Sequence, residues 1–225
     1  MVSRDLRVPR GKGRSAPQEA PAHEPIALVC AAMDFSEVVR RRRMVRAYRP
    51  DPVAPDALRR MLDVARRAPS AGFTQGQSFV VLTAQEARAR MAELCGEADY
   101  VARGFDAWVS TAPVHVVPCV SRAAYEERYA EPDKAPSTKP HEWAVPYWWV
   151  DGGAALMLLL LAAVDEGLAA GVLALDDTPP LRELLGLRPE EVPLGLVTVG
   201  YPAPDRPSGS LARGRKDYSE QVRFR

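Results

Sequence analysis

The sequence predicts an α+β fold in which helices flank a central mixed β-sheet. Apolar residues recur at helical spacing in several segments, and three short apolar runs with strand character lie among them. The connections are too irregular for a regular doubly wound fold, and the chain after Pro207 is basic. We therefore expect one domain over residues 33–225, preceded by a disordered arm over residues 1–32.

The composition is that of an ordinary soluble globular protein. The 225 residues include 30 Lys and Arg against 29 Asp and Glu, which gives a formal net charge of +1. A general nucleic-acid-binding protein needs a domain-wide positive excess, so this balance argues against that class. Only Lys12, Lys134, Lys139 and Lys216 are lysines, and the other 26 basic residues are Arg, which forms forked contacts with phosphate better than Lys does.

Cysteine usage and apolar runs predict a cytoplasmic protein without a membrane span. Cys30, Cys95 and Cys119 are widely spaced and odd in number, so they form no disulfide framework. Residues 1–32 lack the order of a signal peptide. The longest apolar run, 154–164, is shorter than the roughly 20 residues that a bilayer requires.

Two helices are predicted at the start of the domain, separated by a basic and then Pro-broken connector over residues 40–52. Asp34 begins the first helix in a capping box, in which Glu37 reaches back to the cap. Pro55 begins the second helix, where apolar residues follow at spacings of three and four.

The predicted strands are residues 78–83, 114–120 and 192–200, with a helix through Met91 and Leu94 after the first of them. Pro118 indicates an edge strand or a bulge in the second. Residues 131–146 contain four prolines and form a loop long enough to be functional, such as a lid.

The longest predicted helix spans residues 147–167 and is apolar on nearly every side in its second half. Such a helix is buried all round, and a dimer interface is the economical way to bury it in a protein of this size. Thr178 begins one more helix, which ends at Gly186.

Three segments have the composition of ligand contacts, and each has a plain structural alternative. Residues 40–46 place several Arg within reach of one anion, or form a solvated basic face. Residues 68–77 are small and polar enough to approach a planar ligand, or form only a helix-to-strand loop. Arg213 and Arg215 lie on one side of an extended tail, where they grip a phosphate or belong to a disordered basic end.

Other chemistries lack their motifs. The three His are scattered, so no metal site is predicted, and His115 in a strand is best explained as a core residue. There is no G-x-S-x-G elbow and no complete dinucleotide fingerprint. The aromatic residues around Tyr147 and Trp148 either roof a flat ligand or belong to a core or interface.

The order of these segments resembles the nitroreductase family of FMN-dependent oxidoreductases over residues 34–225. The resemblance rests on Arg42-Arg43-Met44-Val45-Arg46, on residues 68–75, on Asp151-x-x-Ala154 opening an apolar helix, on Gly200-Tyr201-Pro202 and on the Arg tail. It implies a cytoplasmic flavoprotein, a homodimer with two FMN sites at the subunit interface.

The resemblance also implies the site residues. The implied FMN contacts are Arg42, Arg43, Met44, Arg46, Pro69, Ser70, Ala71, Gln75, Ala174, Leu175, Arg213 and Arg215. The cations at 42, 43, 213 and 215 would hold the phosphate, Arg46 the pyrimidine edge, and 174–175 the flavin N5. From aromatic content, and not from the resemblance, we expect Phe73, Tyr147 and Trp148, with loop 131–146, to line the substrate pocket over the open flavin face, partly from the partner subunit.

The implied reaction is two-electron transfer from NADH or NADPH through the flavin N5 to an electron-poor small molecule, namely a nitroaromatic, a quinone or an activated alkene. No catalytic side chain is implied, because the cofactor carries the chemistry. The sequence departs from the family pattern at Met44, where Ser is usual, at Phe73, where Asn is common, and at Gly76-Gln77, where Pro-Trp is common.

Three alternatives stay open. One is a specialised enzyme of the same fold: a dehydrogenase, a dehalogenase or a flavin-cleaving enzyme. Another is a non-catalytic flavin-binding protein. The third is a nucleic-acid-binding protein that uses the basic run 40–46, which the near-zero net charge disfavours.

Overall fold

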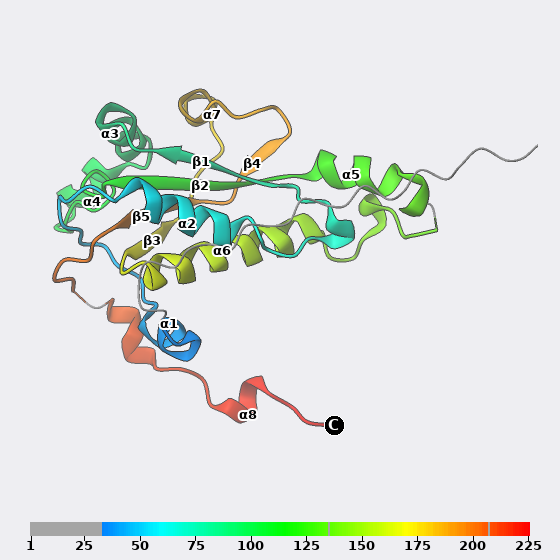
Figure 1. Cartoon of the computed structure of the whole chain (residues 1–225). Helices are drawn as coiled ribbons and strands as arrows, with labels where there is room; N and C mark the ends of the chain where they lie inside the picture. Colours follow the sequence, from blue (N-terminus) through cyan, green and yellow to red (C-terminus); the bar gives the residue numbers. More distant parts are fainter. Residues whose placement is uncertain (1–32, 135, 207) are drawn as a thin grey trace, which may run out of the picture.

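The computed structural model describes residues 33–134, 136–206 and 208–225 and confirms the α+β prediction. A five-stranded sheet lies between two helical layers (Figure 1). Helices α2 (Pro55–Ala65) and α6 (Tyr147–Asp165) pack together on one face, and α3 (Gln85–Leu94) and α7 (Pro179–Leu185) on the other. The predicted arm, residues 1–32, lies outside the described residues.

The sheet has the strand order β1-β2-β5-β3, and β4 also pairs with β2. Its strands are β1 (Gln77–Leu82), β2 (Val114–Ser121), β3 (Ala169–Leu173), β4 (Glu191–Pro193) and β5 (Leu196–Gly200). All pairings between these five strands are antiparallel. The parallel component of the predicted mixed sheet is an isolated bridge between Met44 and Ala170, which anchors the first Arg-rich segment on the sheet.

Each face of the sheet carries its own hydrophobic core. β2 contributes Val117 and Cys119 to the core under α3 and α7, and Val114 and Val116 to the core under α2 and α6. A strand buried on both faces has a continuous rather than an alternating apolar sequence. This explains why residues 114–120 are apolar nearly without interruption.

Of the two alternatives predicted at Pro118, the edge strand is wrong, because Pro118 lies in a central strand. The bulge is confirmed, because the pairing shifts by one residue between Cys119↔Pro193 and Val116↔Val197. The Pro118 carbonyl accepts a hydrogen bond from Leu194 N at 2.8 Å. Because the N and C=O of a strand residue point to the same side, the missing N–H of Pro118 faces the break between β4 and β5. The single strand predicted over 192–200 is interrupted there, where Gly195 adopts a φ of 150°.

The remaining helices are α1 (Phe35–Arg41), α4 (Glu97–Ala102), α5 (Arg122–Ala130) and α8 (Tyr218–Gln221). Asp34 caps α1 as predicted, accepting a hydrogen bond from Ser36 N at 2.9 Å. The rest of the predicted capping box is wrong, because the Glu37 carboxylate instead pairs with Arg40 and Arg41. Helices α4 and α5 and strand β3 were not predicted.

Helix α6 is apolar all round, as predicted, but it is buried on only one face of the described chain. The opposite face, here called the α6 stripe, is half-exposed to exposed and consists of Val150, Ala154, Met157, Leu158 and Leu161. Met157 is 46% exposed and Val150 49%. An apolar face of this kind on a core helix lacks a partner among the described residues.

By length and composition, α6 is long and apolar enough to cross a membrane, with 19 residues and a mean hydropathy of 1.6. This corrects the length argument drawn from residues 154–164 alone. One such helix is weak evidence for a span. Its packing against α2, β1, β2 and β3 is that of the core helix of a globular domain.

Candidate functional site

The segment that carries Arg43 and Arg46 runs extended along strand β3. Val45 N donates to Ala170 O at 3.1 Å, and Val172 N donates to Met44 Sδ at 3.1 Å. The approach is close because Gly171 has no side chain, and a Cβ there would lie 2.5 Å from Val45 O. The sheet therefore holds this segment rigidly.

Arg43 and Arg46 face different cavities. Successive residues of an extended segment point to opposite sides, so positions 43 and 46, three residues apart, face opposite sides. Arg46 lines a cavity of about 600 Å³, whereas Arg43 lines one of about 270 Å³ beside Gly167 and Leu168. The two residues therefore cannot serve one ligand group from the same side.

The larger cavity, here called the Arg46 cavity, combines cationic, aromatic and acidic side chains. The rings of Tyr100 and Phe105 stack with their centroids 4.3 Å apart, and the Arg46 guanidinium lies 5.7 Å from the centre of the Trp108 ring. The Asp205 carboxylate accepts a hydrogen bond from Arg46 N at 2.8 Å. A volume of this size is typical of cofactor sites.

Tyr100, Phe105 and Asp205 were not among the predicted site residues. Asp205 reaches Arg46 because the chain after β5 returns along the Arg-rich segment, where Tyr48 and Pro202 form a bridge and Ala203 N donates to Ala47 O at 3.0 Å. Tyr100 and Phe105 come from α4 and the chain that follows it. Pairing between segments so distant in sequence leaves no local pattern. The only sequence signal was the aromatic pair at positions 100 and 105.

Other predicted FMN contacts lie at the same end of the molecule. Ala174 and Leu175 directly follow β3, whose Val172 contacts Met44. The 3₁₀ helix η4 (Gly209–Arg213) begins at a residue that lines the Arg46 cavity, and Arg213 is its last residue. Arg215 follows, and both of these Arg side chains are exposed.

The second predicted segment, residues 69–75, forms a tight loop around the 3₁₀ helix η1 (Ala71–Phe73). Phe73 and Gln75 have positive φ values of 55° and 54°, in the left-handed region that side chains other than Gly rarely adopt. Ser70 Oγ accepts from Gln75 N at 2.8 Å, and Arg128 Nε donates to Gly72 O at 2.9 Å. These bonds hold the strained backbone in place.

A buried carboxylate supports this loop from below. Asp151, 6% exposed, accepts hydrogen bonds on Oδ2 from Ala71 N at 2.8 Å and from the Tyr125 hydroxyl at 2.7 Å. Burial and the hydrogen bond to Asp151 raise the pKa of Tyr125, so the hydroxyl remains a donor. The loop is thus fixed to α5 and α6 before any ligand binds.

The three predicted pocket aromatics differ in exposure. Phe73 is 76% exposed and Tyr147 45%, but Trp148 is only 8% exposed, in a core cluster with Tyr125. The expectation that Trp148 lines a pocket is therefore not supported, because its ring packs inside the domain. Of the three, only Phe73 and Tyr147 are available to a ligand in this chain.

The two predicted halves of the site lie at opposite ends of α6. Asp151, which holds residues 69–75, is near its first turn, whereas Arg43 lies near its last turn and Gly167. At about 1.5 Å per residue, the helix rises about 21 Å between Asp151 and Asp165. Figure 1 shows the same separation, with α1 and α5 at different ends of the molecule.

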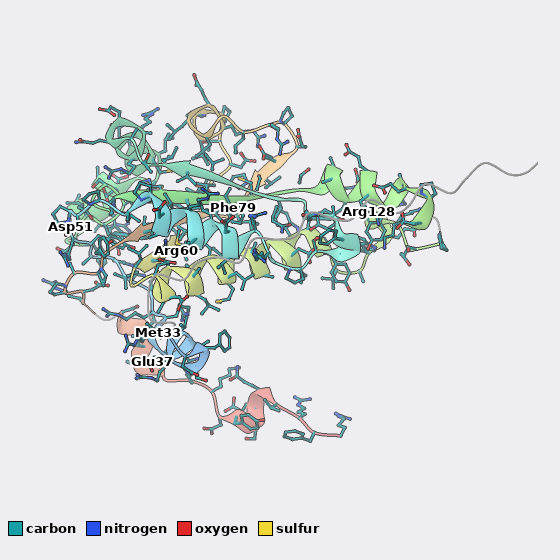
Figure 2. All side chains as sticks on the ribbon, in the orientation of Figure 1. Met33, Glu37, Asp51, Arg60, Phe79 and Arg128 are labelled. Carbon is teal, nitrogen blue, oxygen red and sulfur yellow. The ribbon has the colours of Figure 1, made fainter. Side chains whose placement is uncertain are left out.

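Figure 2 labels residues of both ends: Arg128 on the protruding α5, Glu37 on α1, and Met33 shortly before α1. Arg60, labelled on α2, donates to the Glu166 carboxylate at 2.7 and 2.8 Å and ties α2 to the end of α6. One chain therefore does not unite the Arg segment with the loop at 69–75.

Titratable groups elsewhere have structural roles. His115 is fully buried, as predicted for a core residue; its Nε2 lies 2.8 Å from Val109 O, and burial lowers its pKa to about 4. Hydrogen bonds from Arg188 and Ser78 lower the pKa of Glu191 to about 2. Within residues 33–134, 136–206 and 208–225, no three His, Cys, Asp or Glu residues gather as metal ligands would.

Gln75, predicted as a polar contact to the flavin, is exposed and lines a third cavity of about 530 Å³. Arg188 and Glu190 line the same cavity. Gln75 is thus found at this third cavity and is not among the residues that line the Arg46 cavity.

Comparison with known proteins gives a consistent result. The family model described as the nitroreductase family matches residues 39–201. A protein of Methanothermobacter thermautotrophicus named as an NADH dehydrogenase/NAD(P)H nitroreductase is 27% identical over 175 residues, which cover 76% of this chain and 78% of that protein.

Two solved structures share the fold. A nitroreductase family protein of Streptococcus pneumoniae has a TM-score of 0.68 and 22% identity, covering 85% of this chain and 100% of that one. A nitroreductase of Exiguobacterium sibiricum, solved in complex with FMN, has a TM-score of 0.67 and 21% identity, covering 87% and 99%. At these identities the likeness shows the fold alone.

Proposed function

The chain belongs to the nitroreductase family, and on that premise we propose that it is an FMN-dependent oxidoreductase that uses NADH or NADPH to reduce an electron-poor small molecule. A nitroaromatic, a quinone or an activated alkene fits this description. The observation that carries the proposal is the Arg46 cavity, where a family motif, held on the sheet edge, opens into a space of cofactor size.

The residues around this cavity fit FMN. Arg46 supplies a guanidinium to this cavity. Gly209 also lines the cavity, and the tail that begins there carries Arg213 and Arg215. Guanidinium groups bind phosphate in forked pairs, and a cation near the pyrimidine edge stabilises the negative charge of a reduced flavin. Tyr100 and Phe105 add apolar surface for a planar ring.

When bound, FMN supplies the redox chemistry by taking up a hydride at N5 and passing two electrons on. The chain itself binds, orients and shields the reactants. Its buried histidine, His115, bonds to a core carbonyl and has a lowered pKa, so it is not positioned as a general base. This fits a reaction in which the cofactor carries the chemistry.

A homodimer would unite the two halves of the site. The Arg46 cavity and the loop at 69–75 lie at opposite ends of α6, and the α6 stripe between them is apolar and is not covered by residues 33–134, 136–206 or 208–225. A second copy packed on this stripe would bring the loop of one subunit toward the cavity of the other, giving two equal sites. We propose that Phe73 and Tyr147 then cover the ligand from the partner side.

We also propose that the protein is soluble and cytoplasmic and acts on small molecules, without nucleic-acid or membrane partners. The near-zero net charge supports the exclusion of nucleic acid. The packing of α6 against the sheet supports a core role for that helix.

The test is to add FMN to the purified protein, remove the unbound flavin, identify the retained cofactor by absorbance and mass, and then add NADH or NADPH without oxygen. We expect one FMN per chain and bleaching of the flavin band by one or both nucleotides. A protein that retains no flavin contradicts the proposed cofactor. A flavoprotein that neither nucleotide reduces contradicts the proposed electron donor.

A further inference from the structure

The protruding end of the molecule carries lysines without carboxylate partners. Arg128 is neutralised there by Asp133 at 2.7 Å and by Glu131 at 3.1 Å. Among the residues that the structure describes, Lys139 donates only to carbonyl oxygens, that of Tyr129 at 2.8 Å and that of Lys134 at 3.5 Å. Lys134 has no ion pair within 4.0 Å among the described residues, because the adjacent Asp133 is held by Arg128.

Lys134 lies directly against the strained loop. A Cβ at Gly72 would be 3.3 Å from Lys134 Cε and 2.8 Å from Tyr129 Cε2, so the absence of a side chain at Gly72 lets both residues approach. The Lys134 ammonium lies 5.8 Å from the centre of the Tyr129 ring. Phe73, the next residue in the loop, is 76% exposed. Lys134 therefore lies against the residue that directly precedes an exposed aromatic ring.

The lysine content of residues 131–146 is unusual for this chain. Lysine is rare in the sequence, yet two of the four lysines stand within residues 131–146. Lysine presents a compact charge on a flexible stem, which can reach an anion on a bound ligand without the fixed fork of Arg. The carboxylates nearest to Lys134 are already engaged, so its charge is available.

We propose that Lys134 is a specificity residue that binds the carboxylate of an aromatic electron acceptor, while the aromatic part of that acceptor packs against Phe73. The proposal rests on the proposed function, because it requires the loop at 69–75 to face a flavin site. It narrows the substrate class from electron-poor molecules in general to aromatic carboxylates. The phosphates of a nicotinamide dinucleotide are the other anionic source, and the experiment separates the two.

The test measures the oxidation of pre-reduced holoenzyme in rapid mixing, with the flavin reduced by light so that no nicotinamide is present. The probes are 4-nitrobenzoate and its neutral counterpart 4-nitrobenzamide. In Lys134→Met, we expect the apparent Kd for 4-nitrobenzoate to rise about fivefold, the scale of a partly exposed ion pair, and that for the amide to stay within twofold. Lys134→Arg should retain most of the preference.

Arg90→Met is the matched control, because it removes one exposed cation from α3, away from the loop. The Arg90→Met variant should change the apparent Kd for neither probe. Equal effects of Lys134→Met on both probes would overturn the proposal. So would a rise only in the apparent Kd for NADH or NADPH in the reductive half-reaction, which would assign Lys134 to the dinucleotide phosphates. Absence of bound flavin in the wild-type protein would contradict the proposed function itself.

Discussion

The two ends of α6 carry different kinds of surface. The end near Arg46 is concave, its lining mixes Arg46 and Arg206 with Asp106 and Asp205, and segments far apart in sequence form it: residues 46–47, 100–106 and 204–209. The end near Phe73 is aromatic, and a strained loop forms it together with α5 and the chain that follows. In the proposed dimer the two ends are complementary halves of one site.

The two halves are held rigid in different ways. In the concave half, the bridge between Met44 and Ala170 fixes the Arg segment to the sheet. In the aromatic half, the buried Asp151 carboxylate accepts hydrogen bonds from both the loop and Tyr125 and so holds them together. Substitutions should therefore affect the two halves separately, unless they remove the surface that joins them.

The largest effect is expected from Met157→Arg in the α6 stripe. A charge on a face that is buried between two copies lacks a partner, which costs several kcal/mol, so the protein should become monomeric and lose FMN. Sedimentation equilibrium and flavin content measure both. Val101→Arg is the control, because Val101 is 44% exposed but lies on α4. A dimeric, flavin-loaded Met157→Arg protein would show that the halves meet over another face.

The next effect is expected from Asp151→Ala. The substitution leaves Ala71 N and the Tyr125 hydroxyl without an acceptor, so the free energy of unfolding should fall by about 3 kcal/mol. That corresponds to a melting temperature roughly 9 °C lower. Calorimetry measures this. Asp151→Asn keeps an oxygen acceptor and should recover most of the loss. A stability equal to wild type would mean that the loop does not depend on this carboxylate.

Arg46→Ala should leave stability nearly unchanged and weaken FMN binding. The loss of charge-assisted hydrogen bonds of about 2 kcal/mol corresponds to a roughly 30-fold higher Kd. Titration of the flavin-free protein, followed by quenching of FMN fluorescence, measures it. Arg49→Ala is the control, since Arg49 pairs with Asp51 on the surface and does not line the cavity. Unchanged FMN affinity in Arg46→Ala would remove this cavity from the proposed site.

The smallest effect is a pH dependence that belongs to neither half. The pKa of Glu191 is lowered to about 2 by Arg188 and Ser78, so its stabilisation is complete above its ordinary pKa of 4.5 and disappears as the pH falls toward 2. Because Arg188 is 64% exposed, we expect only about 1 kcal/mol. Unfolding of Glu191→Gln should lack this part of the slope between pH 4.5 and 2. An unchanged slope would assign it to other carboxylates.

Local patterns were enough to predict the α+β class and most helices. Pro55 and the apolar spacing after it define α2, and Gly186, with a φ of 59°, ends α7 as predicted. Strand β3 was missed because three of its five residues, Ala169, Ala170 and Gly171, are small and have little strand character. Helix α5 was missed because its polar sequence has little amphipathic pattern.

The site was predictable only in part, for a physical reason. The Arg46 position was identified from its motif, and the structure places it in a cavity. The aromatic pair and Asp205 reach that cavity through contacts between distant segments, which composition and periodicity do not encode. Trp148 looked like a pocket residue because aromatic content does not distinguish a ring that faces a ligand from one inside the core.

The extended segment at Met44 and Val45 also has a consequence for solubility. Strand β3 lies at the end of the sheet, and an uncovered edge strand offers unpaired N–H and C=O groups to other chains. Val45 N and Met44 Sδ occupy Ala170 O and Val172 N on this edge. The segment proposed to bind a cofactor therefore also covers the edge of β3 and so limits aggregation. A chain shortened past residue 45 would lose the cofactor contacts and the edge cover together.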